Sequence, residues 1–242
     1  MASRRSRGRA RGTCAPPELT SLRLALFDLD GTLLAGDTDV LWCVFLVETG
    51  VLERETFGVA NRDVAERYAR GTISADEFAG FYAATLAGRS AAAWAPVRDR
   101  FVRAEIEPRI GSAARALVAQ HRDAGERLVL TTATNRFLAA PIAASLGIDE
   151  LIATELEIAA NGDFSGRTAG IVNMRAGKVA RIAAWLDAQH LPPAALDAAT
   201  FYSDSVNDLP LLEAVGTPVA VDPDARLREE ATKRGWRVVR VS

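Results

Sequence analysis

The stretch LALFDLDGTLLAG, residues 24 to 36, places two carboxylates directly after a short apolar run. The run 22–28 is typical of a buried strand, and Gly31 and Thr32 end it. Asp28 and Asp30 lie two residues apart, so on an extended strand their side chains point to the same side and repel each other. Ligands of an open parallel sheet bind outside the carboxyl ends of its strands. The pair therefore predicts a site at this strand end that needs a cation.

Short apolar runs alternate with helical patterns over most of the chain. Amphipathic stretches such as 112–125 and 178–189 predict helices between the runs. This alternation is typical of an α/β fold with a doubly wound, mostly parallel, Rossmann-like sheet. The runs that predict its strands are 22–28, 127–132, 150–154, 199–204, 217–221 and 236–240.

The interval 38–107 differs, because it shows helical patterns and no convincing strand. Ser74 and Glu77 form a capping box at the start of one of its helices. The interval is too long for a simple crossover and predicts a small helical domain inserted into the core. The predicted organisation is a disordered basic tail (1–20), an α/β core (21–37 and 108–242) and the helical insertion (38–107).

A second local signal lies in EIAANGDFSGRTAG, residues 157–170. Asn161-Gly162 is a strong indication of a tight hairpin turn between two strands. We expect a structural β-hairpin here, with the rim of the site as the alternative role.

Composition limits the classes of function. The 242 residues are 49% hydrophobic and 25% charged with a formal net charge of -2, which is typical of a globular protein. Five of the arginines lie within residues 1–20, so the rest of the chain is acidic on balance, and we expect no nucleic-acid partner. No apolar run is long enough for a membrane span, and Cys14 and Cys43 offer no disulfide framework. We expect a cytoplasmic protein, and the sequence does not predict its oligomeric state.

A second acidic cluster, YSDSVND (202–208), also follows a predicted strand. Asp204 and Asp208 should therefore reach the same edge of the sheet as Asp28 and Asp30. Four carboxylates around one crevice favour a hard divalent ion, above all Mg²⁺. For Asp208 alone, capping of a helix is an equal alternative.

Two further residues suit an anion at this edge. Thr132, in LTTATN, brings a hydroxyl and neighbouring backbone N–H groups to a strand end. Lys178 opens a predicted helix, where the helix dipole disfavours a cation, so an anionic group should lie nearby. Carboxylates, a hydroxyl, a lysine and a metal together indicate phosphoryl transfer.

These residues, in this order, resemble the four motifs of the haloacid dehalogenase-like (HAD) phosphatase superfamily: FDLDGT, the Thr132 that ends RLVLTT, Lys178 and SDSVND. The similarity runs from about residue 22 to the C-terminus. The helical insertion resembles the C1-type cap of subclass I, and the C-terminal half resembles subfamily IB, which contains phosphoserine phosphatases and bacterial histidinol-phosphatases. Ser203 departs from the glycine that is frequent there, and we expect a slightly tighter loop without loss of metal.

The resemblance implies a role for each motif residue. Asp28 would be the nucleophile that forms an aspartyl-phosphate, and Asp30 the proton donor and acceptor. Thr132 and Lys178 would hold the phosphoryl oxygens. Mg²⁺ would be held by Asp28, the backbone carbonyl of Asp30 and Asp204, with Asp208 as ligand or support. The substrate-binding residues it adds are Asp37, Ala133, Thr134, Asn135 and Asn207.

Asp37 lies where phosphoserine phosphatases place an acid that meets the ammonium group of the substrate. Its alternative role is the N-cap of the helix that begins near Val40. Phe78 and other aromatic residues of the insertion recur at helical spacing, which predicts its core, with contact of one or two of them with the substrate as the alternative. His121 and His190 lie in polar helical contexts, and we expect both to be exposed to solvent.

The leading hypothesis is a Mg²⁺-dependent phosphomonoesterase that acts on a small amino-acid-like phosphate. Histidinol phosphate is the first choice of substrate and O-phosphoserine the alternative. Two other classes stay open: a phosphotransferase or mutase of the same fold, and a non-catalytic phosphate-binding protein. The complete set of motif residues argues against the last of these.

Overall fold

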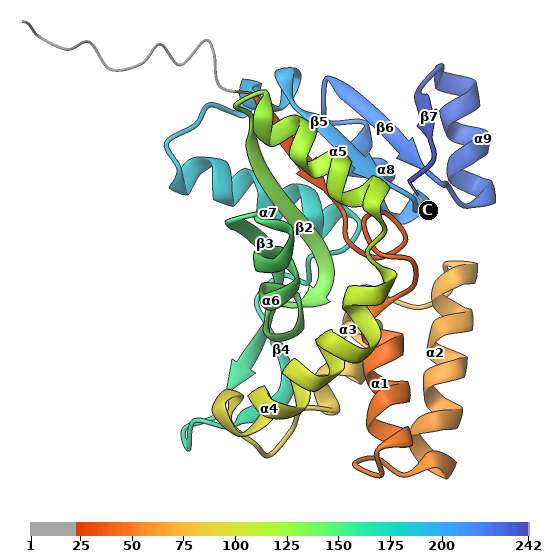
Figure 1. The fold of residues 1–242 in the computed structure, drawn as a ribbon, viewed down its shortest axis with the longest axis vertical. Helices are drawn as coiled ribbons and strands as arrows, with labels where there is room; N and C mark the ends of the chain where they lie inside the picture. The colour runs from red at the N-terminus through yellow and green to blue at the C-terminus, as the bar shows by residue number, and fades with distance from the viewer. Residues whose placement is uncertain (1–22, 242) are drawn as a thin grey trace, which may run out of the picture.

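The computed structural model describes residues 23–241 and contains one seven-stranded sheet (Figure 1). The predicted tail (1–20), with Cys14, lies outside the described residues. The strand order is β4-β3-β2-β1-β5-β6-β7, and every neighbouring pair is parallel except β3 and β4. The strands are β1 (Leu24–Phe27), β2 (Arg127–Asn135), β3 (Glu150–Ile158), β4 (Phe164–Ala169), β5 (Thr200–Ser203), β6 (Thr217–Val221) and β7 (Arg237–Val239).

The central strand, β1, is buried on both faces, as its continuous apolar run predicts. Ala25 and Phe27 point into one hydrophobic cluster, whereas Leu24 and Leu26 point into another. This alternation follows from the period of two along a strand and places a packed layer on each side of the sheet. The predicted doubly wound α/β fold is therefore confirmed.

The two layers are built by the helices that follow the strands. Helices α5 and α6 contribute to the cluster around Phe27, and α7, α8 and α9 contribute to the cluster around Leu26. The bounds of these helices are α5 (Ser112–Asp123), α6 (Arg136–Leu146), α7 (Ala176–Ala188), α8 (Leu209–Leu212) and α9 (Ala225–Arg234). Short 3₁₀ helices span η4 (Glu107–Arg109), η5 (Pro193–Ala198) and η6 (Val206–Asp208).

Between β1 and β2 the described chain forms helices only, as the sequence predicts. In Figure 1 these inserted helices lie at the end of the sheet toward which the arrow of β2 points. Ser74 caps α3, its Oγ accepting a hydrogen bond from the Glu77 N–H at 3.1 Å. The inserted helices are α1 (Thr38–Glu48), α2 (Val59–Arg70), α3 (Ala75–Ala84) and α4 (Ala91–Phe101), with π-helical turns η2 (Arg54–Gly58) and η3 (Val102–Ile106).

The inserted helices share a hydrophobic cluster with the sheet. Trp42 of α1 packs edge to face on Phe101 of α4, with ring centroids 5.1 Å apart. Both belong to the same cluster as Phe27 of β1 and Leu130 of β2. Burial of this apolar surface fixes the insertion on the sheet.

The predicted hairpin is present and is bonded to the insertion. β3 and β4 pair antiparallel, and Gly162 in the turn has a φ of 86°, which favours glycine. Backbone bonds join the hairpin to the loop after α3: Gly88 N–H donates to Phe164 O and Phe164 N–H donates to Arg89 O, both at 3.0 Å. Of the two predicted roles, the structure supports the structural one.

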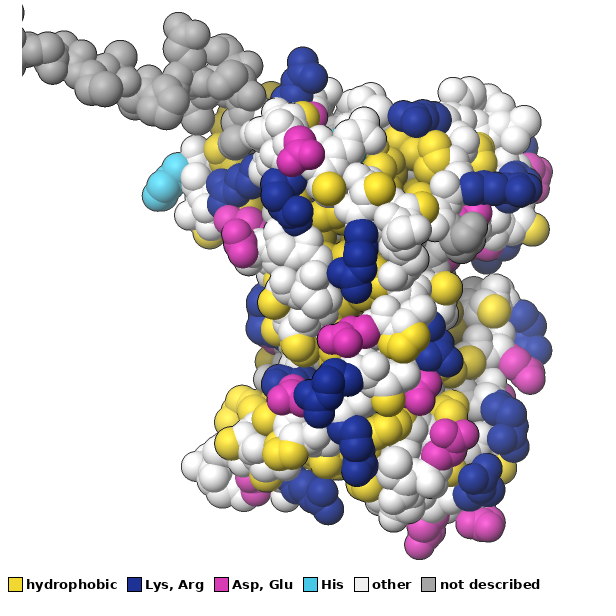
Figure 2. Space-filling view, in the orientation of Figure 1, with side chains coloured by type: hydrophobic (Ala, Val, Ile, Leu, Met, Phe, Trp, Pro, Cys, Tyr) yellow, Lys and Arg dark blue, Asp and Glu magenta, His cyan; other side chains and the backbone are white. Residues whose placement is uncertain are grey.

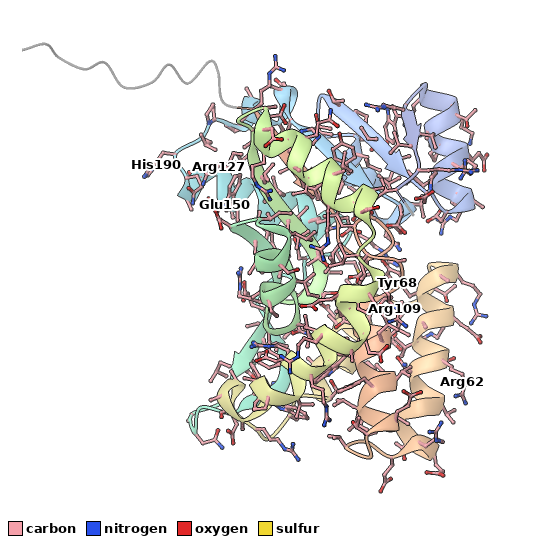
Figure 3. All side chains as sticks on the ribbon, in the orientation of Figure 1. Arg62, Tyr68, Arg109, Arg127, Glu150 and His190 are labelled. Carbon is pink, nitrogen blue, oxygen red and sulfur yellow. The ribbon has the colours of Figure 1, made fainter. Side chains whose placement is uncertain are left out.

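His121 is buried, so its predicted exposure is wrong. The ring lies 9% exposed on α5, with Nδ1 2.6 Å from Glu126 Oε2 and Nε2 2.7 Å from the Tyr202 hydroxyl. Tyr202 is a residue of β5 that stacks on Phe27 at 5.2 Å. Helix α5 places the histidine over the sheet, where a partner distant in sequence satisfies its second nitrogen. His190 is exposed, as predicted, and its side chain points away from the fold (Figure 3).

None of the helices in the part of the chain that the structure describes has the length and apolar character needed to cross a membrane. On the face seen in Figure 2, lysine and arginine side chains are interspersed with aspartate and glutamate, and neither sign gathers on this face.

Tyr202→Phe should lower the free energy of unfolding by about 1–3 kcal/mol, because it leaves the buried His121 Nε2 without a partner while keeping the stacked ring. Urea denaturation monitored by circular dichroism measures the change. The control His190→Asn, at an exposed position, should stay within about 0.5 kcal/mol of the wild type. Equal stability of both variants would contradict the role of the His121–Tyr202 pair.

Candidate active site

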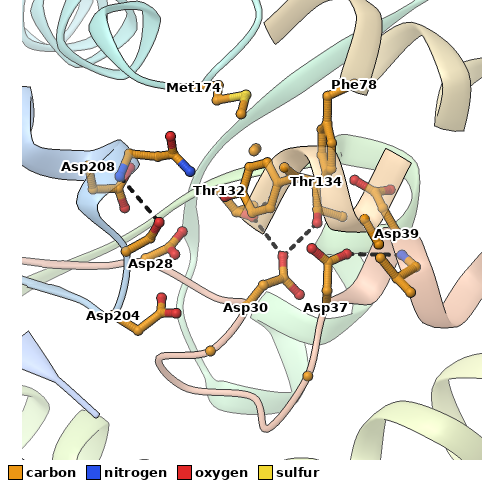
Figure 4. Close-up of a pocket in the computed structure, with 18 of the residues that line it drawn as sticks. Asp28, Asp30, Asp37, Asp39, Phe78, Thr132, Thr134, Met174, Asp204 and Asp208 are labelled. Carbon is orange, nitrogen blue, oxygen red and sulfur yellow. Dashed lines mark hydrogen bonds between the residues drawn. The ribbon is translucent and has the colours of Figure 1, made fainter. Parts of the chain in front are cut away.

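A cavity of about 460 Å³ lies at the carboxyl ends of β1, β2 and β5 (Figure 4). It is lined from the sheet side by the residues that follow β1, by the end of β2, by the start of α7 and by the loop after β5. The inserted helices α1, α2 and α3 line the opposite side. Predicted site residues that line it are Asp28, Asp30, Asp37, Thr132, Ala133, Thr134, Lys178, Asp204, Asn207 and Asp208.

Lys178 joins the two acidic motifs. Its Nζ donates to Asp28 Oδ1 at 2.8 Å and to Asp208 Oδ2 at 2.6 Å, and the lysine is only 2% exposed. Burial lowers the pKa of Lys178, but the carboxylates of Asp208 and Asp28 outweigh it and raise the pKa above its usual value. These carboxylates are the anionic groups that the position of the lysine predicts.

Ser203, the departure from the family pattern, extends this network. Its Oγ donates to Asp208 Oδ2 at 2.8 Å and accepts from the Ser205 N–H at 3.2 Å. Asp208 is therefore held by Lys178 and Ser203, and its side chain caps no helix. The serine ties the loop after β5 to its own acidic residue, in line with the predicted tighter loop.

Asp30 is held in a cradle of hydroxyl groups. Its Oδ1 accepts from the Thr38 N–H at 2.7 Å and from Thr38 Oγ1 at 2.5 Å, and its Oδ2 accepts from Thr134 Oγ1 at 2.7 Å. Thr132 Oγ1 approaches the same oxygen at 3.4 Å. Burial raises the pKa of Asp30 although these hydrogen bonds lower it. The net effect favours the protonated form of Asp30 more than water does.

Gly31 and Thr32 of the DGT triplet lie directly against Asp204. Thr32 Oγ1 donates to Asp204 Oδ1 at 3.1 Å and accepts from the Asp204 N–H at 3.0 Å. A Cβ on Gly31, whose φ is 73°, would overlap the Asp204 carboxylate. Burial and the neighbouring Asp208 raise the pKa of Asp204 to about 7. The glycine thus lets two acidic loops approach each other closely.

Within residues 23–241 no three acidic, histidine or cysteine side chains converge closely enough to form a metal centre by themselves. Any ion at this site would need oxygen ligands besides the carboxylates. Asp28, which burial gives a pKa well above its usual value despite Lys178, and Asp204 line the same cavity. Buried carboxylates that are costly to ionise are the donor set that a hard cation stabilises.

Asp37 lines the cavity and also caps α1. Its Oδ1 accepts from the Val40 N–H at 2.9 Å, so its predicted capping role is confirmed. Burial and the charge of Asp30 raise its pKa to about 7. The cap uses Oδ1, and contact with a substrate stays a prediction.

Asn135, a predicted substrate-binding residue, does not line the cavity. It is the N-cap of α6, where its Oδ1 accepts from the Leu138 N–H at 3.1 Å, and its Nδ2 donates to Asp39 Oδ1 at 3.3 Å. The side chain therefore links α6 of the core to α1 of the insertion. Both of its polar atoms are used within the protein.

The cavity also has a wall that the sequence does not predict as part of the site. Asp39, Tyr68 and Met174 line it, together with Phe78, for which we predicted a place in the insertion core. Phe78 fulfils both roles, since it is 2% exposed and packs against Tyr68 at 4.6 Å. Asp39 is buried, and burial together with Asp37 raises its pKa well above the usual value. In the sequence, the helical spacing of the aromatic residues of the insertion is the pattern that could have indicated this wall.

Comparison with protein families gives a match to the haloacid dehalogenase-like hydrolase model over residues 25–213. Two named relatives cover most of this chain. A histidinol-phosphatase of Neisseria meningitidis is 36% identical, over 89% of this chain and 97% of the relative. The phosphoserine phosphatase SerB1 of Mycobacterium tuberculosis is 34% identical, over 95% of this chain and 74% of the relative.

Solved structures agree with this match. A protein of unknown function from Bordetella pertussis Tohama I superposes with a TM-score of 0.85 at 42% identity, covering 91% of this chain and 99% of that one. A substrate-bound phosphoserine phosphatase complex has a TM-score of 0.66 at 16% identity, covering 92% and 94% of the two chains, and shows the shared fold. This chain belongs to the haloacid dehalogenase-like hydrolase family. The predicted superfamily, hydrolase class and fold are confirmed.

The acidic cavity should make the ligand-free protein less stable as pH rises from about 4 to about 7. Between the ordinary pKa of an aspartate, about 4, and the value of about 7 for Asp37 in the folded protein, the folded state binds more protons than the unfolded state. The free energy of unfolding therefore falls with increasing pH in this window. Asp37→Asn, which keeps an N-cap, should make that fall shallower.

Urea-unfolding midpoints measured at intervals across this pH range, in the absence of divalent ions, test the effect. Asp123→Asn, at an exposed position of α5, is the matched control and should run parallel to the wild type. A curve for Asp37→Asn that is as steep as the control would disprove the assignment.

Proposed function

We propose that the protein is a Mg²⁺-dependent phosphomonoesterase that works through an aspartyl-phosphate on Asp28. One observation carries the proposal: Asp28 is bound by the buried Lys178 in the cavity where Asp30, with its raised pKa, also lies. A carboxylate nucleophile, a proton donor and a cation for the phosphoryl group are thereby brought together. The family membership and the phosphatase names of the relatives support the reaction class.

In the first step a carboxylate oxygen of Asp28 forms a bond to phosphorus while the bond from phosphorus to the ester oxygen breaks. Asp30 gives its proton to the departing alkoxide, which leaves as an alcohol. In the second step Asp30 takes a proton from water, the water oxygen bonds to phosphorus, and Asp28 is released. Inorganic phosphate and the free enzyme result, with Asp30 protonated again.

Lys178 and Thr132 would hold the phosphoryl oxygens. An ammonium group has three N–H donors, and Lys178 uses two of them on Asp28 and Asp208, so the third is left for the substrate. Thr132 Oγ1 accepts from the Thr134 N–H at 3.1 Å, which orients its hydroxyl at the end of β2. Both groups are fixed before substrate binds, as electrostatic catalysis requires.

Mg²⁺ would be held by the carboxylates of Asp28 and Asp204 and by the backbone carbonyl of Asp30. Two side chains with a backbone oxygen agree with the lack of a three-side-chain centre among the described residues. Asp208 would support this set, because Lys178 and Ser203 hold its Oδ2 in place. When bound, the ion would offset the repulsion between these carboxylates and the phosphate.

The charges of the cavity favour a cationic leaving group. Its described lining has one basic side chain, Lys178, which is already paired with two acids. The acidic lining residues are Asp28, Asp30, Asp37, Asp39, Asp204 and Asp208. An α-carboxylate, as in O-phosphoserine, would meet no free cation among these residues, whereas an ammonium group would meet Asp37. Histidinol phosphate has an amine and an imidazole but no carboxylate, so we favour it.

The apolar wall supports the same choice. Tyr68, Phe78 and Met174 line the cavity and are the apolar groups that a flat ring would contact. In Figure 4 Phe78 and Met174 lie above the row of acidic side chains. O-phosphoserine has no group that would cover this wall. The phosphotransferase, mutase and binding-protein alternatives have no specific observation in their favour, and the cytoplasmic location stays a prediction.

The rate constant kcat/KM should be at least about tenfold higher for histidinol phosphate than for O-phosphoserine, and Asp37→Asn should lower the former about 10- to 150-fold. This range corresponds to the loss of a charged hydrogen bond of about 1.5–3 kcal/mol. Hydrolysis of p-nitrophenyl phosphate, which has no amine, should scarcely change. The rate of phosphate release measures the substrate preference, the effect of Asp37→Asn and the hydrolysis of p-nitrophenyl phosphate.

Asp28→Asn is the control, and it should abolish turnover of every substrate while the circular dichroism spectrum is kept. Equal losses on histidinol phosphate and p-nitrophenyl phosphate would mean that Asp37 acts only as a cap. A preference for O-phosphoserine would favour the alternative substrate.

Removal of divalent ions with EDTA should silence the enzyme, and Mg²⁺ should restore it. Ca²⁺ should restore little, because its larger and more variable coordination shell suits in-line transfer less well. Activity that survives exhaustive chelation would refute the role of the metal while leaving the substrate prediction open to its own test.

A further inference from the structure

Arg175 has a backbone conformation that suits glycine and not arginine. It precedes α7 with φ 54° and ψ -127°, and few other non-glycine residues of the described chain have a positive φ. A side chain in this region is strained, and such strain persists where the surrounding structure enforces it. The position therefore calls for a reason to keep this side chain.

The side chain reaches the loop after β5. Arg175 Nε donates to Asn207 Oδ1 at 3.0 Å, and the Asn207 N–H donates to Ser205 Oγ at 3.2 Å. Asn207 lines the cavity, whereas Arg175 does not. Together with the bond from Lys178 to Asp208, the start of α7 is thus tied to this loop at two points.

The bond decides which way the amide of Asn207 faces. A guanidinium has only donors, so the atom next to Arg175 must be the amide oxygen. The amide nitrogen then lies at the other end of the group, and no residue of the described chain accepts a hydrogen bond from it. Its two N–H donors are left for a ligand in the cavity.

We propose that Arg175 is a positioning residue, which fixes Asn207 so that its Nδ2 donates to a phosphoryl oxygen. The inference rests on the proposed function, because it assigns the phosphoryl group to this cavity. On this interpretation, the bond from the Arg175 side chain to Asn207 is the reason for an arginine at a position whose φ favours glycine. Arg175 itself touches neither the substrate nor the reacting atoms.

The test compares Arg175→Ala, Arg175→Gly, Asn207→Ala and the double variant Arg175→Ala/Asn207→Ala. Both Arg175 variants should lower kcat about 5- to 10-fold with little change in KM, on p-nitrophenyl phosphate and on the amine substrate alike. Asn207→Ala already removes the bond between Arg175 and Asn207, so removal of Arg175 as well should add no further loss. The double variant should therefore be no slower than Asn207→Ala. Arg62→Ala, at an exposed position of α2 (Figure 3), is the matched control and should equal the wild type.

Two measurements do not depend on turnover. The affinity for inorganic phosphate in the presence of Mg²⁺, measured by calorimetry, should weaken by a similar factor in Arg175→Ala and Asn207→Ala. Arg175→Gly should melt at a higher temperature than Arg175→Ala, because glycine relieves the strained φ. If the wild type binds phosphate but hydrolyses no phosphomonoester, the proposed function fails alone, and the phosphate affinities decide the inference.

Three results would overturn the inference. Arg175→Ala with the kcat and phosphate affinity of the wild type would show that Asn207 needs no support. If the fold-loss of kcat in the double variant equals the product of the losses in the two single variants, Arg175 acts independently of Asn207. A loss confined to substrates with a carboxylate would show that Arg175 binds the substrate directly.

Discussion

The site depends on one buried ammonium group between two carboxylates. Lys178 is nearly inaccessible to water and bonds to Asp28 after β1 and to Asp208 after β5, so it joins the start of α7 to two strand ends. Breaking a buried ion pair by removing one partner typically costs about 3–5 kcal/mol, since the remaining charge is left without compensation. Here the loss of the lysine would leave two such charges. The same group therefore holds three chain segments together and lowers the pKa of Asp28 against the effect of burial.

The rest of the fold keeps the opposite wall of the cavity in place. The insertion shares its hydrophobic cluster with β1 and β2, the hairpin of β3 and β4 bonds to the loop after α3, and Asn135 links α6 to α1. Helix α1, which carries Trp42 of this cluster and the Asp39 that Asn135 contacts, is therefore held to the core at two points.

The sequence was sufficient for residues whose place follows from topology. Asp28, Asp30 and Asp204 follow strand ends and Thr132 is among the last four residues of β2, and parallel strands bring their carboxyl ends to one edge. It was insufficient where a side chain has competing partners: Asn135 could face the cavity or cap α6, and the choice depends on a rotamer. The predicted exposure of His121 was wrong for a related reason, because its partner Tyr202 lies 81 residues away in the chain. The conformation of Arg175 is set by the turn into α7, which no local pattern indicates.

The acidic excess of the cavity links stability to specificity. Without a ligand, burial and mutual repulsion keep the pKa of Asp37 and of Asp204 at about 7, so the folded protein tolerates the crowded carboxyl groups partly by binding protons. A cation that enters the cavity favours the ionised forms, and its binding must release those protons. Asp204 would respond to a metal ion and Asp37 to an ammonium group, because the two lie on opposite sides of Asp30 in Figure 4. The same unfavourable charge that weakens the empty site would therefore be the source of the preference for a cationic phosphate ester that we propose.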